Sequence, residues 1–393
     1  MRTRPSPGVV AISDFRQHLE TLAVRIGPRG SATEEEGAAA DYVAAQLRSF
    51  GLDCQRQRFP APTSFSWAYL AIMGTGPLAA ALFPFLPGLA FVLALLGSLA
   101  YLLESSTYPF FGRLVPKRPS VNVIAKSHAR SKELRRILVL AHLDSSRSGL
   151  SFSPKMVAGF RSSFLMSFMS LPLLAILYGL VLLWPAAPRD LLWIISLLPA
   201  AVLLWGCLTL IHRELFGAIT PGANDDASGL AVLLETARVI ARSPLLTTSV
   251  WFVATGAEES GLWGALHLIR ECAFDPGKTM VINLDNLGRG RLALTTCEGM
   301  VIPHRAGPAL IEAARASAAE KGTDLALRPY RLLTTDATAF LARRIPAASI
   351  MAFDERGLLP NWHWPTDTIE HVDEENLADA RDLVLGMIRR LEE

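Results

Sequence analysis

The stretch Pro221-Gly-Ala-Asn-Asp-Asp-Ala-Ser-Gly-Leu-Ala-Val-Leu-Leu-Glu235 reads as a turn that opens directly into an amphipathic helix. Asn224, Asp225 and Asp226 occupy the positions of helix N-caps, and the leucines after them recur at helical spacing. Capping is the ordinary role of such aspartates. A second role has to be considered, because other histidine and carboxylate side chains follow strand-like segments elsewhere in the chain.

The composition is too apolar for an ordinary soluble enzyme. Of 393 residues, 51% are hydrophobic and only 19% are charged, whereas soluble domains carry about 25% charged residues. The net charge of +2 gives no basis for a nucleic-acid partner. The four cysteines are far apart in the sequence, so we expect free thiols and no zinc knuckle. The N-terminus lacks the apolar core and cleavage site of a signal peptide.

The excess hydrophobicity is concentrated in three segments without charged residues, 59–103, 162–188 and 191–211. About 20 apolar residues span a bilayer core, and the first segment is long enough for two short helices. We therefore predict an integral membrane protein with two inserted transmembrane helical hairpins, 66–104 and 163–211. Their four predicted helices are 66–83, 88–104, 163–185 and 191–211, with Trp67, Tyr101, Trp184 and Trp193 near the ends as interfacial aromatic residues.

Two other interpretations of these segments remain open at the level of sequence. They could be buried core helices of a large soluble protein, although core helices rarely run so long without a charge. The first hairpin contains Pro77, Pro84 and Pro87, which would also suit a re-entrant element or one that lies at the membrane interface.

Outside the hairpins, strand patterns alternate with helix patterns, which indicates a three-layer αβα fold with a mostly parallel mixed sheet. Without an internal repeat or a low-complexity linker, residues 1–393 read as a single catalytic domain with the hairpins inserted in its loops. The predicted strands are 52–59, 121–125, 136–141, 247–255, 279–283, 292–296, 325–330 and 347–353, and the predicted helices include 10–26, 262–272, 306–320 and 373–392.

Candidate functional residues follow the predicted strands. Sites in open α/β sheets form where the carboxyl ends of strands meet loops, and His142, Glu258, Glu259 and Asp285 stand at such ends. Imidazole and carboxylate ligands suit zinc and neighbouring divalent metals. Asp144 lies two residues after His142, so it could orient the imidazole ring. Of the adjacent glutamates, one can bind metal while the other stays free as a general base.

Five motifs occur in the order found in one enzyme family, and together they carry a clear resemblance. The chain resembles the aminopeptidase S, aminopeptidase Y and glutamate carboxypeptidase family of co-catalytic zinc exopeptidases, over about residues 30–390. The motifs are Ala-His142-Leu-Asp144-Ser, Gly222-Ala-Asn-Asp225-Asp-Ala-Ser-Gly229, Gly256-Ala-Glu258-Glu259-Ser-Gly261, Asn283-Leu-Asp285-Asn and Trp362-His363-Trp-Pro-Thr-Asp367-Thr.

The resemblance implies a two-zinc site and a role for each matching residue. Asp225 would bridge the two zinc ions, with His142 and Asp285 at one and Glu259 and His363 at the other. Glu258 would take the proton from a metal-bridged water and deliver it to the leaving amine, and Asp144 would support the first zinc ligand. The resemblance also implies a cis peptide bond between Asp225 and Asp226. These roles predict a zinc metallopeptidase, and more narrowly an aminopeptidase that hydrolyses terminal peptide bonds.

Other polar residues receive more ordinary interpretations. Glu34, Glu35 and Glu36 read as a solvated first helical turn, opened by a capping box that starts at Ser31. Asp336 and Asp367 read as caps or supporting groups, not as metal ligands. The remaining histidines match no motif and read as structural: His128, His212, His267, His304 and His371.

The hairpins depart from the soluble members of the family. Both leave near the predicted catalytic face, so we expect contact with the lipid bilayer and a preference for membrane-associated or hydrophobic peptide substrates. The flanking Lys and Arg residues place the catalytic domain in the cytoplasm by the positive-inside rule. Two alternative functions stay open: a one-zinc acyltransferase like the glutaminyl cyclases, and a catalytically inactive peptide-binding or membrane-complex subunit. The sequence leaves the oligomeric state open.

Overall fold

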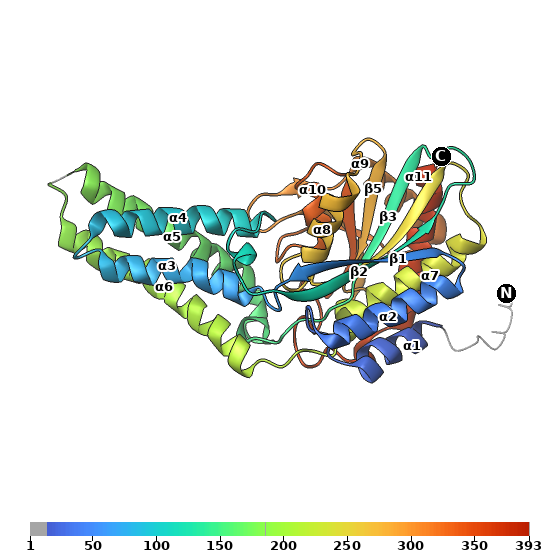
Figure 1. Cartoon of the computed structure of the whole chain (residues 1–393), viewed down its shortest axis with the longest axis horizontal. Helices are drawn as coiled ribbons and strands as arrows, with labels where there is room; N and C mark the ends of the chain where they lie inside the picture. The colour runs from blue at the N-terminus through green and yellow to red at the C-terminus, as the bar shows by residue number, and fades with distance from the viewer. Residues whose placement is uncertain (1–13, 185, 393) are drawn as a thin grey trace.

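A computed structural model describes residues 14–184 and 186–392. The molecule is elongated: an α/β body holds the sheet, and four helices project from one end of it (Figure 1). The described residues at both ends of the chain lie on the body, away from the projecting helices (Figure 1).

The body is built on one nine-stranded mixed sheet in the order β1-β2-β4-β3-β5-β9-β6-β7, with β8 also paired to β6. Its four central strands β4, β3, β5 and β9 are mutually parallel, whereas β1, β2 and β7 pair antiparallel with their neighbours. The predicted mixed sheet is thus confirmed, with its parallel part at the centre. The strands are β1 (Asp53–Ala61), β2 (Arg118–Ser127), β3 (Arg135–His142), β4 (Thr248–Thr255), β5 (Thr279–Leu284), β6 (Arg291–Glu298), β7 (His304–Arg305), β8 (Ala326–Tyr330) and β9 (Ala347–Phe353).

Helices cover both faces of the sheet, because β3, β4 and β9 are apolar on both sides. One apolar core joins the sheet to α1 (Asp14–Leu19), α2 (Glu34–Ser49), α7 (Ser228–Arg242), α9 (Pro308–Lys321) and α11 (Glu374–Glu392). A second core, on other sheet residues, contains side chains of α8 (Trp263–Cys272) and α10 (Asp336–Leu341).

The projecting helices come from the two apolar regions of the sequence. They are α3 (Ser66–Leu82), α4 (Pro87–Ser105), α5 (Phe160–Leu183) and α6 (Arg189–Phe216). They share an apolar core of their own, in which Tyr178 stacks on Phe83 at a ring-centroid distance of 4.4 Å. Many outward-facing side chains of the same helices are also apolar, for example Leu183 with 86% of its surface exposed.

Three helices in the described part of the chain are long and apolar enough to cross a membrane: α4, α5 extended from Val157, and α6. The remaining one, α3, is apolar but has only 17 residues. At a rise of about 1.5 Å per residue, its length of about 26 Å is slightly less than the hydrocarbon core of a bilayer. Among the four predicted transmembrane helices, α3 is therefore the shortest.

Local structure differs from the sequence-based expectation at several points. Thr33, not Ser31, caps α2 by accepting the backbone N–H of Glu36. The first predicted helix continues from α1 into a π-helical turn over Glu20–Ile26, and its predicted residues 10–13 lie outside the described residues. Tyr101, expected at an interface, is buried inside the helical bundle because it packs on Tyr69, Phe164 and Phe168.

Candidate metal centre

His142 lies at the carboxyl end of the central strand β3, where its ring and its backbone are both held. Ring Nδ1 lies 3.0 Å from the backbone oxygen of Asp144, and ring Nε2 lies 3.0 Å from Oδ1 of Asp225. The backbone N–H of His142 donates to the carboxylate of Asp226 at 3.1 Å. The bond at Nδ1 directs Nε2 toward the centre of the site, as a metal-binding histidine requires.

Asp225 stands in the irregular turn Ala223–Ala227 that precedes α7. The peptide bond between Asp225 and Asp226 is cis, as predicted. The carboxylate of Asp367 accepts the backbone N–H groups of Asn224 at 2.6 Å and of Asp225 at 3.1 Å. These bonds fix the turn and leave the Asp225 carboxylate free to face the histidines.

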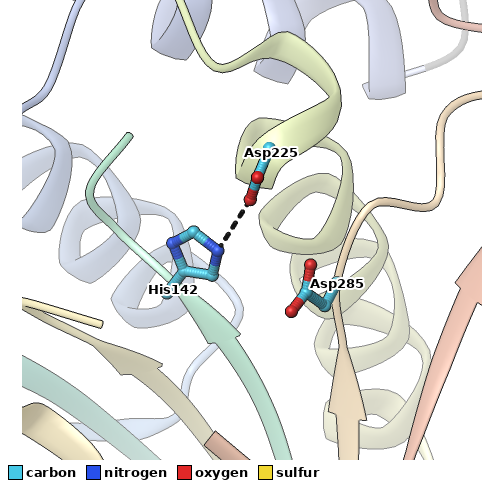
Figure 2. Close-up of side chains that lie close together, drawn as sticks. All are labelled: His142, Asp225 and Asp285. Atoms are coloured by element: carbon cyan, nitrogen blue, oxygen red, sulfur yellow. Dashed lines mark hydrogen bonds and ion pairs between the residues drawn. The ribbon is translucent and has the colours of Figure 1, made fainter. Parts of the chain in front are cut away.

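The predicted metal ligands converge on one pocket. They form three groups of possible metal ligands, and within each group the ligand atoms lie within 4.8 Å of one another. Asp225 belongs to two of these groups, and the third contains Glu258. Figure 2 shows the first group, in which His142 and Asp285 come from strand ends and Asp225 from the helical turn above them. The groups are His142–Asp225–Asp285, Asp225–Glu259–His363 and His142–Glu258–Glu259, and no other histidine of the described residues belongs to one.

The second group has the unpaired atoms that a cation would satisfy. His363 Nε2 lies 3.2 Å from Asp225 Oδ2 and 3.1 Å from Glu259 Oε1. Within the described residues, both of these oxygens are buried and accept no hydrogen bond. Buried carboxylate oxygens without a partner are costly. Oxygen and imidazole donors facing one point therefore fit a divalent cation such as zinc.

The electrostatics of the cluster agree with a site that needs positive charge. Burial, followed by the charge of Asp225, raises the pKa of Asp285 to about 7. Burial lowers the pKa of His363, but the charge of Glu259 and the close ion-pair contacts with Asp225 and Glu259 outweigh it and raise this pKa to about 9. Burial also raises the pKa of Glu258 well above its usual value. Carboxylates and imidazoles buried this close together favour a bound proton or cation over net negative charge.

Asp144 is fully buried and supports two parts of the site at once. Its carboxylate accepts the backbone N–H groups of Glu258 and Glu259, each at 3.1 Å, and the hydroxyl of Ser31 at 2.5 Å. The sequence predicted an interaction with the imidazole of His142, but the nearer contact to that ring is the backbone oxygen of Asp144, while its carboxylate oxygen lies 3.6 Å away. The carboxylate thus mainly fixes the loop that carries the two glutamates.

Glu36 is a supporting residue that the sequence interpretation got wrong. It is 1% exposed, whereas its neighbours Glu34 and Glu35 are exposed as expected. Its carboxylate accepts the backbone N–H of Ala257 at 2.7 Å and the hydroxyl of Ser120 at 2.8 Å. Glu36 therefore holds the start of the Glu258 loop, because the first turn of α2 packs against that loop.

Arg29 is a second supporting residue, and it had not been singled out. The side chain is fully buried and donates to five backbone carbonyl oxygens, two of them in the turn before Asp225 and one beside His142. It thereby ties the His142 strand end to the Asp225 turn. No side-chain motif accompanies Arg29, so the only sequence signal is its position between Gly27-Pro28 and Gly30.

Fold and donor set together define an α/β protein with a candidate metal-binding pocket at the carboxyl ends of its central strands. Residues 211–388 match the family model of peptidase family M28. This part of the chain, a little under half of its length, is similar to that family.

Two named relatives show a similarity of the same kind. The chain is 32% identical over 178 residues to aminopeptidase YwaD of Bacillus subtilis, which covers 43% of this chain and 37% of that protein. It is 29% identical over 183 residues to the probable lipoprotein aminopeptidase LpqL of Mycobacterium tuberculosis. This match covers 39% of this chain and 36% of that protein. The matches thus span little more than a third of these relatives.

Solved structures show the same fold over nearly the whole chain. A zinc aminopeptidase of Bacillus subtilis aligns with a TM-score of 0.56 at 18% identity and covers 96% of this chain and 94% of its own. A glutaminyl cyclase of Porphyromonas gingivalis aligns with a TM-score of 0.57 at 18% identity. This alignment covers 96% of this chain and 97% of the cyclase chain. At such identities the likeness concerns the fold alone, so function has to be argued from the site.

Proposed function

We propose that the protein is a membrane-integral, two-zinc exopeptidase, and more narrowly an aminopeptidase. The observation that carries the proposal is that Asp225 lies in two donor groups at once, one with His142 and Asp285 and one with Glu259 and His363. Four residues spread over more than two hundred positions thus converge on the carboxylate of Asp225. The relatives named as aminopeptidases support the choice of reaction.

The proposed roles follow the chemistry of the side chains. Zinc, when bound, supplies positive charge that lets a water molecule lose a proton near neutral pH. Glu258 is the proposed general base, which accepts that proton and later donates it to the leaving amine. Asp144 is a positioning residue, because its carboxylate fixes the backbone of Glu258 and Glu259. Arg29, Glu36 and Asp367 hold the loops on which the donors stand.

The metal count separates this proposal from the two alternatives. Two zinc ions per chain support the co-catalytic exopeptidase, one supports a glutaminyl cyclase-like acyltransferase, and none supports an inactive subunit. The experiment is elemental analysis of the purified, zinc-equilibrated protein, combined with an assay on leucine p-nitroanilide. One zinc per chain, or no release of p-nitroaniline from a two-zinc protein across a panel of amino acids, would overturn the proposal.

We further propose that all four projecting helices are embedded in a lipid bilayer. The outward-facing apolar side chains of α4, α5 and α6 support this, since so large an apolar surface is unfavourable in water. Contacts between α3 and the longer helices α4 and α6 would carry the shorter helix into the bilayer with them.

Charge supports a cytoplasmic position of the catalytic body. Most basic residues that flank the hairpins stand on the body side, whereas Arg189 lies at the far end and donates to the backbone oxygens of Phe83 and Pro84. By the positive-inside rule, the body is then cytoplasmic. Protease digestion of sealed, right-side-out vesicles tests this orientation. Cleavage of the body by protease added outside these vesicles contradicts it. The body-side basic residues are Arg56, Arg58, Arg113, Lys117, Arg118, Lys155, Arg161 and Arg213.

This placement brings the metal centre close to the lipid surface. We therefore propose membrane-associated or hydrophobic peptides as substrates. Enzyme reconstituted in liposomes is expected to cleave a lipid-anchored peptide faster than a soluble dipeptide of the same terminal residue. Equal rates for the two would remove the reason for the proposal.

A further inference from the structure

A single cavity joins the candidate metal centre to the projecting helices. Its volume is about 530 Å³, within the range of small-molecule sites. At one end it is lined by Glu258 and Glu259, and farther along by side chains of all four projecting helices, such as Tyr69, Tyr101 and Phe164. One amino-acid side chain would fill only a fraction of this space.

The cavity also reaches the outer surface between α5 and α6. Met166, Leu198 and Trp205 line it, and their exposed fractions are 57%, 75% and 58%. Along α6 the lining runs from Leu198 to Arg213, a distance of about 22 Å at the helical rise. If the helices are in a bilayer, this opening faces lipid and lies beside the hydrocarbon chains.

The lining offers an occupant few free hydrogen-bonding groups. Glu104 already accepts the backbone N–H groups of Phe110, Phe111 and Gly112. The hydroxyl of Tyr101 donates to Ser167 at 3.3 Å, and that of Thr209 to a carbonyl oxygen of its own helix at 2.8 Å. An extended peptide buried here would leave its backbone groups unsatisfied, which is costly in an apolar environment. A saturated alkyl chain has no such groups.

We propose that this cavity binds a long alkyl chain of the substrate, which passes laterally from the bilayer between α5 and α6 while the scissile amide lies at the metal centre. The inference rests on the proposed exopeptidase function and specifies its substrate as an alkyl-bearing amide. The chain can be carried on the terminal residue or on the leaving amine, and both forms share the same chemistry.

Two series of zinc-loaded assays test the proposal. One series uses p-nitroanilides of α-amino acids with unbranched side chains, and the other uses leucine n-alkyl amides. In one of them kcat/KM should rise by about fourfold for each methylene that enters the cavity, until the cavity is filled. The series that rises identifies the side of the scissile bond that carries the chain. No rise in either series overturns the proposal.

A matched pair of variants locates the effect. Ser163 and Ser162 are adjacent, exposed residues near the start of α5, and only Ser163 lines the cavity. Ser163→Trp should abolish the dependence on chain length, and Ser162→Trp should leave both the dependence and the rate on the shortest substrate unchanged. An equal effect of both variants, or of neither, contradicts the assignment.

A binding measurement separates failure of this inference from failure of the proposed function. An alkyl amine with a terminal photoreactive diazirine is added to the zinc-free protein in detergent micelles, and the cross-linked peptides are mapped by mass spectrometry. Cross-links should concentrate on the parts of α5 and α6 that line the cavity and be lost in Ser163→Trp but not in Ser162→Trp. Labelling confined to the outer surface, and equal in both variants, overturns the cavity assignment whatever the enzyme assay shows.

Discussion

The backbone N–H of Glu258 donates a 3.1 Å hydrogen bond to a carboxylate oxygen of Asp144. Through this bond, the residue two positions after His142 also sets the position of the proposed base. The other oxygen of Asp144 accepts from Glu259 and from Ser31. Each carboxylate oxygen of Asp144 therefore already accepts at least one hydrogen bond. A group that donates hydrogen bonds could not replace either oxygen without losing one of them.

Asp144→Asn tests this arrangement. The amide places an NH₂ group against at least one N–H donor, so the loop that carries Glu258 should shift. We expect kcat to fall by about ten- to a hundredfold and the free energy of unfolding to fall by about 1–3 kcal/mol. Steady-state kinetics and thermal unfolding of the zinc-loaded protein measure both. Ser31→Ala, which removes a single donor, should show a much smaller loss, and equal losses in the two variants would contradict the argument.

Glu258→Gln tests the proposed general base. Glutamine keeps the size of the side chain but cannot accept a proton, so the rate should fall by about a hundredfold or more. Because the two proposed zinc sites are built from His142, Asp225, Glu259, Asp285 and His363, the zinc content should stay unchanged. Kinetics and elemental analysis are done on the same preparation, with the exposed Glu271→Gln as control. A rate like that of the parent protein would falsify the base assignment.

Zinc binding should strengthen as the pH rises from about 6 to about 9. The zinc-free protein holds protons at His363, whose pKa is raised to about 9, and at Asp285, whose pKa is raised to about 7. Zinc has to displace these protons, so affinity falls when the pH drops below these values. Competition titrations with a chromophoric chelator at several pH values measure it, and an affinity that does not change with pH contradicts the prediction.

The same protons affect the stability of the zinc-free protein. A raised pKa of His363 in the folded state contributes stability that is present below the unfolded pKa of 6.5 and is lost as the pH rises through about 9. The raised pKa of Asp285 acts in the same direction between the ordinary Asp value of 3.8 and about 7. Zinc replaces the lost protons, so the gap in Tm between zinc-loaded and EDTA-treated protein should widen from pH 6 to pH 8.5. A gap that narrows over this interval contradicts the sign.

Glu36→Ala tests the support of the Glu258 loop by α2. The change leaves the buried N–H of Ala257 and the hydroxyl of Ser120 without their acceptor, at a cost of about 1–3 kcal/mol of unfolding free energy. The rate should fall as well, since Ala257 immediately precedes the proposed base. Glu35→Ala, at an exposed neighbouring position, is the control and should change neither quantity. Equal behaviour of the two variants contradicts the assigned role.

The sequence was informative where the signal is local. Continuous apolar runs located the central strands. Because parallel strands end at one edge of the sheet, His142 and Asp285 could be expected from the sequence to lie together. The bonds of Glu36 and Arg29 could not be found in this way. Glu36 meets Ala257 across 221 positions, and Arg29 contacts backbone carbonyls, which leave no trace in residue identity. The three consecutive glutamates Glu34, Glu35 and Glu36 also suggested that the whole first turn of α2 is exposed to solvent.

Arg29→Lys tests whether the two halves of the metal centre are held in register by one side chain. The guanidinium donates to carbonyl oxygens at Leu143, Pro221 and Gly222 simultaneously, and an ammonium group cannot reach all of them because its three donors diverge from one atom. We expect a loss of about 3 kcal/mol or more of unfolding free energy and weaker zinc binding, since the His142 strand end and the Asp225 turn would separate. Thermal unfolding and chelator competition measure the two effects, with the exposed Arg25→Lys as control. Loss of stability with unchanged zinc affinity would show that Arg29 supports the fold but does not align the donors.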